Sequence, residues 1–336
     1  MKEKSVIMST KKKLKKLTIQ QEIHDRNPGM PLELDWVNEV RVNMSAVERR
    51  AQTIGKRRSI KKQWQAAWLL KAVSCIDLTT LAGDDTPGRV KRLCAKARQP
   101  VRKDILNSYE IENLKVGAVC VYHNRVEEAV KSLNGSNIPV AAVSTGFPAG
   151  QISLEEKIRQ IQQSVSAGAV EIDIVISRDH VLTGDWESLY SEVSAFREVC
   201  GAAHMKTILA TGELATLRQV AKSSLVCMMA GADFIKTSTG KETINATLEV
   251  SLTMIRQIRE YYDRTGYKIG FKPAGGISKA KQALAWLALM KEELGNDWLN
   301  SNLFRFGASS LLMDIERQLE HNLSNQYSAS YRHPMA

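Results

Sequence analysis

Two lysines stand inside apolar segments that have the composition of buried strands, Lys236 within residues 233–240 and Lys272 within residues 269–276. Lysine is rarely buried without a partner, because removing an ammonium group from water is costly. Burial and a second nearby cation both favour the neutral amine and lower its pKa. A neutral amine attacks carbonyl groups and forms Schiff bases. The two lysines therefore indicate carbonyl chemistry, with a buried structural ion pair as the alternative.

Other polar residues stand at or inside further apolar runs. Asp77 ends the first run, Asp173 interrupts the fourth, and Lys206 opens the fifth. In a barrel, catalytic groups project from the carboxyl ends of the strands, and neighbouring strands lie about 4.8 Å apart. A single pair such as Asp173–Lys272 would favour a structural salt bridge. Two lysines and two aspartates at strand ends favour catalysis instead.

Two turns that contain glycine have the composition of an anion-binding site. Residues 273–277 follow the seventh apolar run, and residues 307–310 follow the eighth. Barrels commonly bind phosphate with these two loops, through backbone N–H groups and a helix N-terminus. Glycine lets the backbone approach the anion, and serine hydroxyls add donors. Gly240 and Lys241, which follow the sixth apolar run, can add a further N–H donor and a positive charge. The expected phosphate ligands are therefore Gly240, Lys241, Gly275, Gly276, Gly307, Ser309 and Ser310.

Eight short apolar runs alternate with amphipathic stretches that have helical periodicity. The expected strands cover residues 73–78, 117–122, 140–145, 170–176, 206–210, 234–238, 269–273 and 303–307. Two of the expected helices are 154–167 and 243–264. Eight such units predict an α/β protein of the (β/α)8 TIM barrel class. A doubly wound open sheet is the alternative, but its GxGxxG turn is absent from the sequence.

The chain divides into four expected regions. Residues 1–30 are a basic disordered tail, residues 31–72 a helical extension, residues 73–321 the barrel, and residues 322–336 a flexible tail. The net charge is +11, and residues 1–20, with seven lysines and one glutamate, supply +6 of it. That tail could be a nuclear signal or a nucleic-acid tether. A solvated tail is favoured, because no RNA-binding motif accompanies the lysines.

The sequence indicates neither a metal centre nor another cofactor. Its six histidines show no paired ligand spacing, and its five cysteines form no CxxC motif. Scattered cysteines indicate a reduced intracellular protein, which we expect in the cytoplasm, with a nuclear fraction left open. No apolar run approaches the length of a transmembrane helix. Cys120 is expected to be a packed thiol beside the site.

Seven segments, in order, resemble deoxyribose-phosphate aldolase. They are residues 77–81, 120–122, 171–175, 211–214, 234–241, 270–276 and 306–310. The segment 234–241 is highly specific, and the long N-terminal extension resembles that of the eukaryotic branch. The resemblance implies a cofactor-free class I aldolase of deoxyribose phosphate catabolism. Such an enzyme reversibly cleaves 2-deoxy-D-ribose 5-phosphate into D-glyceraldehyde 3-phosphate and acetaldehyde.

The resemblance also implies a role for individual residues. Lys236 would form the Schiff base, Lys272 would lower its pKa, and Asp173 would shuttle protons with a water molecule. The remaining expected substrate contacts are Asp77, Thr79, Cys120, Lys206 and Thr239. The physics of the sequence alone does not decide which lysine is the nucleophile.

Two departures from the family pattern and two rival interpretations remain. His123 stands where many relatives have proline, and Tyr331 or Tyr327 is a candidate to reach the site from the C-terminal tail.

One rival is a different Schiff-base aldolase acting on a phosphorylated metabolite. The other is a non-enzymatic role in which the basic N-terminus recruits a nucleic acid or an acidic protein. A homo-oligomer is compatible with the sequence.

Overall fold

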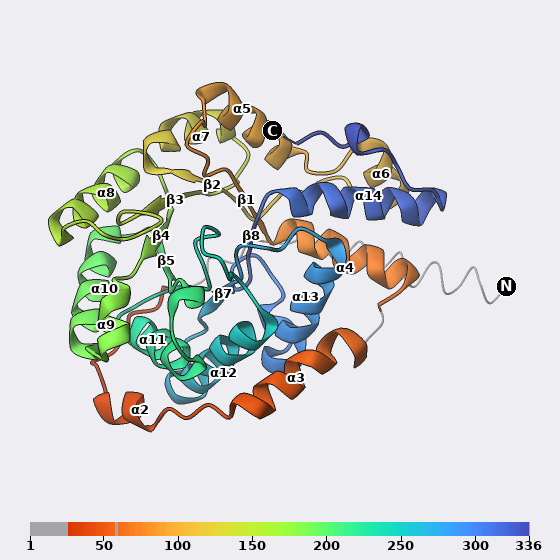
Figure 1. Cartoon of the computed structure of the whole chain (residues 1–336). Coiled ribbons are helices and arrows are strands. Elements are labelled where there is room, and N and C mark those ends of the chain that lie inside the picture. The colour runs from red at the N-terminus through yellow and green to blue at the C-terminus, as the bar shows by residue number, and fades with distance from the viewer. Residues whose placement is uncertain (1–25, 58–59, 336) are drawn as a thin grey trace.

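Eight parallel strands form a barrel surrounded by helices (Figure 1). The computed structural model describes residues 26–57 and 60–335. The strands are β1 Ile76–Thr79, β2 Ala118–Tyr122, β3 Val140–Ser144, β4 Glu171–Val175, β5 His204–Ile208, β6 Phe234–Lys236, β7 Gly270–Lys272 and β8 Phe306–Ala308. They pair in the order β7-β6-β5-β4-β3-β2-β1-β8. Each lies within or next to the run that predicted it, and the predicted (β/α)8 barrel is confirmed.

The barrel closes between β7 and the chain that leads into β8. The N–H of Phe271 donates to the carbonyl of Leu303 at 2.9 Å, and the N–H of Gly307 donates to the carbonyl of Pro273 at 2.9 Å. Most strand residues are buried, because one face of each strand packs in the lumen and the other against the helices. This arrangement explains why the strands read as nearly continuous apolar runs.

The helices alternate with the strands along the chain. They are α2 Leu34–Glu39, α3 Met44–Arg57, α4 Lys62–Ser74, α5 Pro87–Arg98, α6 Lys103–Ser108, α7 Val126–Leu133, α8 Leu154–Ser166, α9 Arg178–Thr183, α10 Trp186–Cys200, α11 Leu217–Met229, α12 Leu248–Thr265, α13 Ala280–Leu294 and α14 Ser310–Ser324. The α12 helix begins later than the predicted residue 243. The hydroxyl of Thr247 caps it by accepting the N–H of Val250, and the preceding residues form the loop that follows β6.

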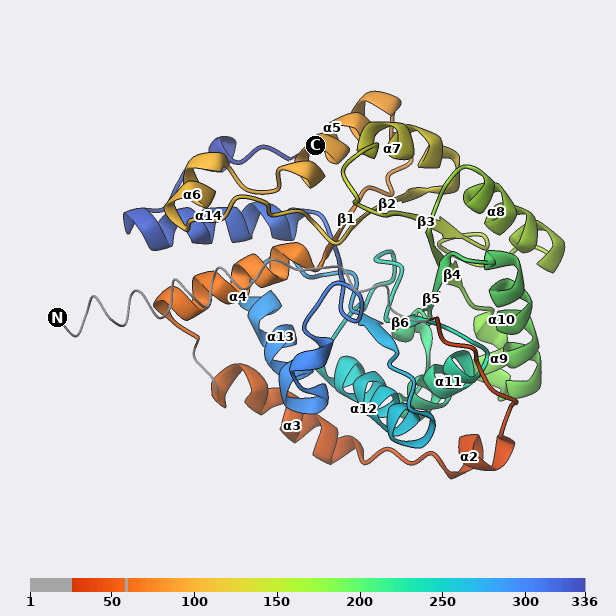
Figure 2. The ribbon, with the colours of Figure 1, turned by 180° about the vertical axis from the view of Figure 1, so that it is seen from behind.

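Three of these helices come from the N-terminal segment that was predicted to be helical. Of these, α3 lies beside α12 and α13, and α4 packs between α13 and α14 (Figure 2). Trp36 of α2 stacks with Tyr261 of α12 at a ring-centroid distance of 6.2 Å. The extension therefore covers the outside of the barrel over its second half.

Residues 26–30, expected in the disordered tail, lie against the amino-terminal end of the barrel. The Asp233 carboxylate, just before β6, accepts the backbone N–H of Asn27 at 2.9 Å. The buried Asn27 side-chain amide donates to the carbonyl of Met228 at 2.8 Å. The hydroxyl of Tyr261 donates to Asn27 Oδ1 at 3.2 Å. A buried polar anchor thus orders this end of the segment, and the rest of the expected tail lies outside the described residues.

The C-terminal tail, expected to be flexible, has a buried anchor of its own. The His333 side chain lies 3.3 Å from the Glu316 carboxylate and 2.8 Å from the Glu320 carboxylate, both on α14. Tyr327 and Tyr331 are 72% and 83% exposed. In this structure the tail therefore docks on an outer helix and directs both tyrosines to solvent.

We predict that Asn27→Ala lowers the free energy of unfolding by about 1–3 kcal/mol, because the substitution leaves buried polar partners unsatisfied. Urea unfolding measures this loss. The matched control is Asn322→Ala, which removes an exposed hydrogen bond to Tyr109 and should change stability by less than about 0.5 kcal/mol. Folded Asn27→Ala should keep full turnover, because Asn27 lies at the end of the barrel opposite the lysines. A turnover defect at unchanged stability would contradict this placement.

Candidate active site

Five charged side chains from five strands meet inside the barrel. They are Asp77 on β1, Asp173 on β4, Lys206 on β5, Lys236 on β6 and Lys272 on β7, and all are buried. Strand register places Lys206 opposite Asp173 and Lys272 opposite Lys236. Residues on one face of neighbouring strands point the same way. The Lys236–Lys272 pair lies two residues further along the strands than the Asp173–Lys206 pair, because Lys206 is opposite Phe234, and the long lysine side chains bring the charged groups together.

The Asp173 carboxylate is at the centre of this cluster. Its Oδ2 atom accepts hydrogen bonds from Nζ of Lys236 and Nζ of Lys272, each at 2.7 Å. Its Oδ1 atom accepts from Nζ of Lys206 at 3.2 Å. The two lysines that the sequence singled out thus share one carboxylate oxygen.

A second set of ion pairs supports the cluster. Arg305, which precedes β8, donates to Asp77 Oδ1 at 2.6 Å and to Glu171 Oε1 at 2.8 Å. Lys206 pairs with Glu171 as well as with Asp173. This buried lysine therefore connects the two carboxylates of the network. The sequence analysis did not select Glu171 or Arg305. An acidic residue two positions before Asp173 and an arginine between two phenylalanines were the available signals.

The surrounding charges shift the pKa values of the two lysines in opposite directions. Burial lowers the pKa of Lys236, the charge of Lys272 lowers it further, and the opposing pull of Asp173 does not restore it. Burial also disfavours the ammonium form of Lys272, but Asp173 and Asp77 outweigh burial and raise its pKa. The same cations overcome burial at Asp173 and hold its pKa well below its usual range. The site therefore disfavours the ammonium form of Lys236 and stabilises that of Lys272.

A count of charges explains this difference. The seven groups are the carboxylates of Asp77, Glu171 and Asp173 and the basic groups of Lys206, Lys236, Lys272 and Arg305. The carboxylates outweigh the effect of burial and raise the net pKa of three of the four basic groups, Lys206, Lys272 and Arg305, but not that of Lys236. Three anions balance three cations, which makes Lys236 the surplus amine of the network.

A cavity of about 340 Å³ opens above the network. Its lining residues are Thr79, Thr80, Leu81, Ala82, Arg89, Lys236, Thr239, Gly240, Lys241, Ala274, Gly275, Gly307, Ala308 and Ser309. The Lys236 side chain is 3% exposed, whereas the Lys272 side chain is 0% exposed. Of the two lysines, Lys236 is thus the one that a molecule in this cavity would meet.

The cavity brings together the loops that were predicted to bind phosphate. Gly240, Lys241, Gly275, Gly307 and Ser309 all line it, and the other two predicted ligands follow Gly275 and Ser309 directly in the chain. The α14 helix begins at the residue after Ser309, and helix N-termini favour anions. These loops therefore form a rim suited to a phosphate group.

The backbone at Gly275 requires glycine. Its φ is +82°, and a Cβ atom there would lie 2.5 Å from the Asn245 side chain. This contact joins the loop after β7 to the loop after β6. A side chain at this position would push the two rim loops apart.

The other predicted substrate contacts take different positions. Thr79 and Thr239 line the cavity. Cys120 packs with Ala141 and Val143 in a small buried apolar cluster, and burial raises the pKa of its thiol to about 11. It is therefore a neutral packing group. The sequence analysis missed Arg89, whose position on α5 gave no signal because it follows no strand directly.

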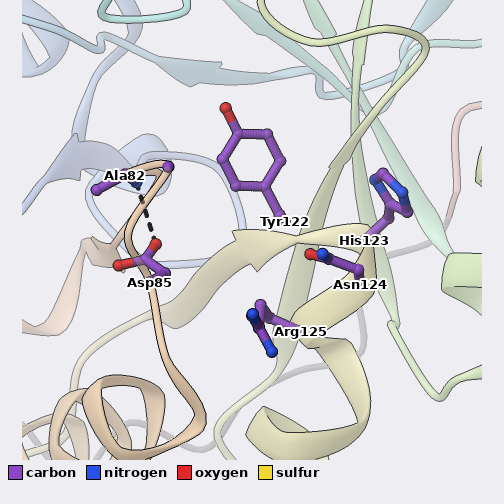
Figure 3. A pocket seen from close by; sticks show the side chains of 7 residues that line it. Ala82, Asp85, Tyr122, His123, Asn124 and Arg125 are labelled. Carbon is purple, nitrogen blue, oxygen red and sulfur yellow. Dashed lines mark hydrogen bonds between the residues drawn. The ribbon is translucent and has the colours of Figure 1, made fainter.

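A second cavity of about 250 Å³ shares the lining residue Ala82 with the first, and Figure 3 shows the side chains around it. It lies between the loop after β1 and the end of β2, where the N–H of Ala82 donates to the Asp85 carboxylate at 3.1 Å. His123 lines this second cavity, and burial lowers the pKa of its imidazole. The residue that departs from the family pattern thus stands beside the main cavity as a neutral ring.

Within the described residues, no group of three or more His, Cys, Asp or Glu side chains could hold a metal ion. The described helices include none long and apolar enough to span a membrane.

Comparisons with known proteins identify the family. Residues 71–313 match the DeoC/LacD family of aldolases. The chain is 58% identical over 312 residues to deoxyribose-phosphate aldolase of Mus musculus, covering 92% of this chain and 98% of that protein. It is 56% identical over 314 residues to deoxyribose-phosphate aldolase of Homo sapiens, covering 92% and 99%.

A solved structure of similar fold supports the architecture. The tetrameric deoxyribose phosphate aldolase from Aeropyrum pernix matches with a TM-score of 0.57 and 21% identity, covering 83% of this chain and 99% of that one. From the family match and these relatives, the chain belongs to the DeoC/LacD family and is an aldolase, a lyase that acts on a carbon–carbon bond.

Proposed function

We propose that this aldolase reversibly cleaves 2-deoxy-D-ribose 5-phosphate into D-glyceraldehyde 3-phosphate and acetaldehyde through a Schiff base on Lys236. The observation that carries the proposal is that Lys236 is the surplus amine of a balanced ionic network and lines the cavity. The names of the relatives support the substrate. The phosphate-type rim supports a phosphorylated sugar over a neutral aldehyde.

Schiff-base formation begins at the neutral amine. Nζ of Lys236 adds to C1 of the open-chain sugar and gives a carbinolamine, and loss of water then gives an iminium. Asp173 Oδ2, 2.7 Å from this Nζ, is placed to take and return the protons of these steps through a bound water. Lys272, hydrogen bonded to the same oxygen, keeps the carboxylate in its basic form and orients it.

Carbon–carbon cleavage follows from the charge of the iminium. The C2–C3 bond breaks, its electrons move into the iminium to give a neutral enamine, and the C3 hydroxyl gives its proton to the Asp173 carboxylate through the bound water. D-Glyceraldehyde 3-phosphate leaves with C3 to C5. The iminium adds a fourth positive charge to the network, and enamine formation removes it. Protonation of the enamine at C2 and hydrolysis then release acetaldehyde and regenerate the amine.

The rim supplies orientation. In this proposal the 5-phosphate binds between Lys241, the loop after β7 and the start of α14, and Gly276 and Ser310 add backbone donors. Thr79 and Thr239, which line the cavity, contact the sugar hydroxyls. Holding the phosphate and C1 in two fixed places converts the bond cleavage into an effectively intramolecular step.

Borohydride trapping tests the Schiff base. The protein incubated with 2-deoxy-D-ribose 5-phosphate and reduced should carry a mass adduct on the peptide that contains Lys236. Lys236→Arg, which keeps a cation but not the nucleophile, should remove both adduct and turnover while retaining its circular dichroism. An adduct on Lys272 would exchange the roles of the lysines, and cleavage of another phosphorylated sugar in preference would move the enzyme to a different Schiff-base aldolase.

Lys272→Met tests the charge balance. Removing one cation makes the charged form of Lys236 balance the three carboxylates, so the pKa of Lys236 rises. Activity requires the neutral amine and increases with pH through this pKa. The acidic limb of kcat/KM should therefore move to higher pH, and activity should recover in alkaline buffer. Lys279→Met, at an exposed position, is the control, and an unmoved limb in Lys272→Met would refute the coupling.

Ser309→Asp tests the phosphate rim. A carboxylate at the start of α14 repels a phosphate and competes for the same donors, so KM for 2-deoxy-D-ribose 5-phosphate should rise by about tenfold or more. The kcat/KM for unphosphorylated 2-deoxy-D-ribose should change little. Steady-state kinetics with the two sugars measures the ratio. Equal losses on both sugars would place the phosphate elsewhere.

A further inference from the structure

The loop between β6 and α12 contains a carboxylate that the proposed mechanism does not use. Glu242 accepts the backbone N–H of Thr239 at 3.0 and 3.1 Å with its two oxygens. Its Oε2 atom also accepts the N–H of Gly240 at 3.1 Å and the hydroxyl of Thr239 at 2.8 Å. Three donors therefore converge on one carboxylate.

The geometry of these donors is that of an anion-binding nest. Successive backbone N–H groups that point to one side form such a concavity when a residue adopts positive φ, and Gly240 has φ +87°. In the described part of the chain no ion pair joins Glu242 to a basic side chain. The loop donors themselves hold the carboxylate in place.

The nest belongs to the rim of the active-site cavity. Thr239 and Gly240 line that cavity together with Gly275 and Ser309. A Cβ atom at Gly240 would lie 3.8 Å from Cα of Gly275, so the nest directly adjoins the loop after β7. An anion bound on this rim and the Glu242 carboxylate would compete for the same N–H groups, and their like charges would repel.

We propose that Glu242 is an internal occupant of the β6-loop anion site that the phosphate of the substrate displaces. The inference rests on the proposed function, because it assigns a phosphorylated ligand to the rim. Displacement opposes phosphate binding, so Glu242 sets the affinity for the phosphate group and is a specificity-determining residue. It also couples the loop to the ligand, because the released carboxylate no longer holds Thr239 and Gly240.

The experiment measures inorganic phosphate binding to the full chain by calorimetry. Glu242→Gln removes the charge and weakens the contact at nearly constant shape, and Glu242→Ala removes the occupant. Both variants should bind phosphate about tenfold more tightly, the size expected when a ligand no longer displaces a charge-assisted hydrogen bond. The control is Glu249→Gln, which removes the same charge from the first turn of α12 and should leave the affinity near that of the unchanged protein.

Kinetics gives a second readout. In both Glu242 variants KM for 2-deoxy-D-ribose 5-phosphate should fall, and the ratio of kcat/KM for this sugar to kcat/KM for unphosphorylated 2-deoxy-D-ribose should rise. If Glu242 only shapes the loop, both variants bind phosphate more weakly, and that result overturns the proposal. Unchanged affinity, equal tightening in Glu249→Gln, or no phosphate binding by any of the proteins overturns it as well.

The two proposals can fail separately. Phosphate binding does not depend on turnover, so tighter binding in the Glu242 variants would support the displaced occupant even if the unchanged enzyme failed to cleave 2-deoxy-D-ribose 5-phosphate. Cleavage of that sugar with unchanged phosphate affinity in the variants would retain the proposed function and reject the role of Glu242.

Discussion

The shared carboxylate of Asp173 is the interaction on which the rest of the site depends. It accepts from three lysines, and it remains ionised in a buried position because those cations outweigh the cost of desolvation. Asp77 and Glu171 contribute the other two negative charges, with Arg305 between them. The network therefore has three negative charges, which balance three cations, but it contains four basic groups. The basic group whose pKa is lowered is Lys236, because burial and a neighbouring ammonium disfavour its charged form.

A barrel provides this arrangement because its strands bring groups from distant parts of the chain together in a packed interior. The first acid of the network is on β1 and its arginine lies just before β8, and the β1–β8 pairing at Asp77–Gly307 brings them together. Strands of three residues are sufficient at β6, β7 and β8, since each has only to place one or two side chains. Flexible supports would let the lysines separate, and the pKa difference between them would then shrink.

The sequence predicted the barrel and located every strand to within a few residues, because strands buried on both faces leave long apolar runs. It also pointed to the lysine pair and to Asp173, since charged residues inside such runs stand out. It left the roles of Lys236 and Lys272 open, because those roles follow from a charge count that includes Arg305. Contacts between residues more than two hundred positions apart, such as Arg305–Asp77 and Asn27–Asp233, leave no local pattern. The sequence also did not reveal that α12 starts late. Its helical periodicity continues through the residues after Glu242, but Glu242 binds the backbone of its own loop there.

In the proposed mechanism, the part of the site that binds the anionic phosphate is separate from the part where charge changes during the reaction. At the rim, glycine loops, Lys241 and the start of α14 present positive potential to an anion without taking part in bond breaking. At the base, a network that is balanced with neutral Lys236 gains a positive charge when the iminium forms. An iminium in balanced surroundings accepts electrons more readily than one held by a carboxylate of its own, since Asp173 already shares its charge with Lys206 and Lys272. Asp173 is therefore not an exclusive partner of the iminium, and the surrounding cations keep its carboxylate ionised beside the reacting atoms. By this argument, an additional carboxylate at the base would stabilise the iminium and slow cleavage, whereas the same charge at the rim would act on binding.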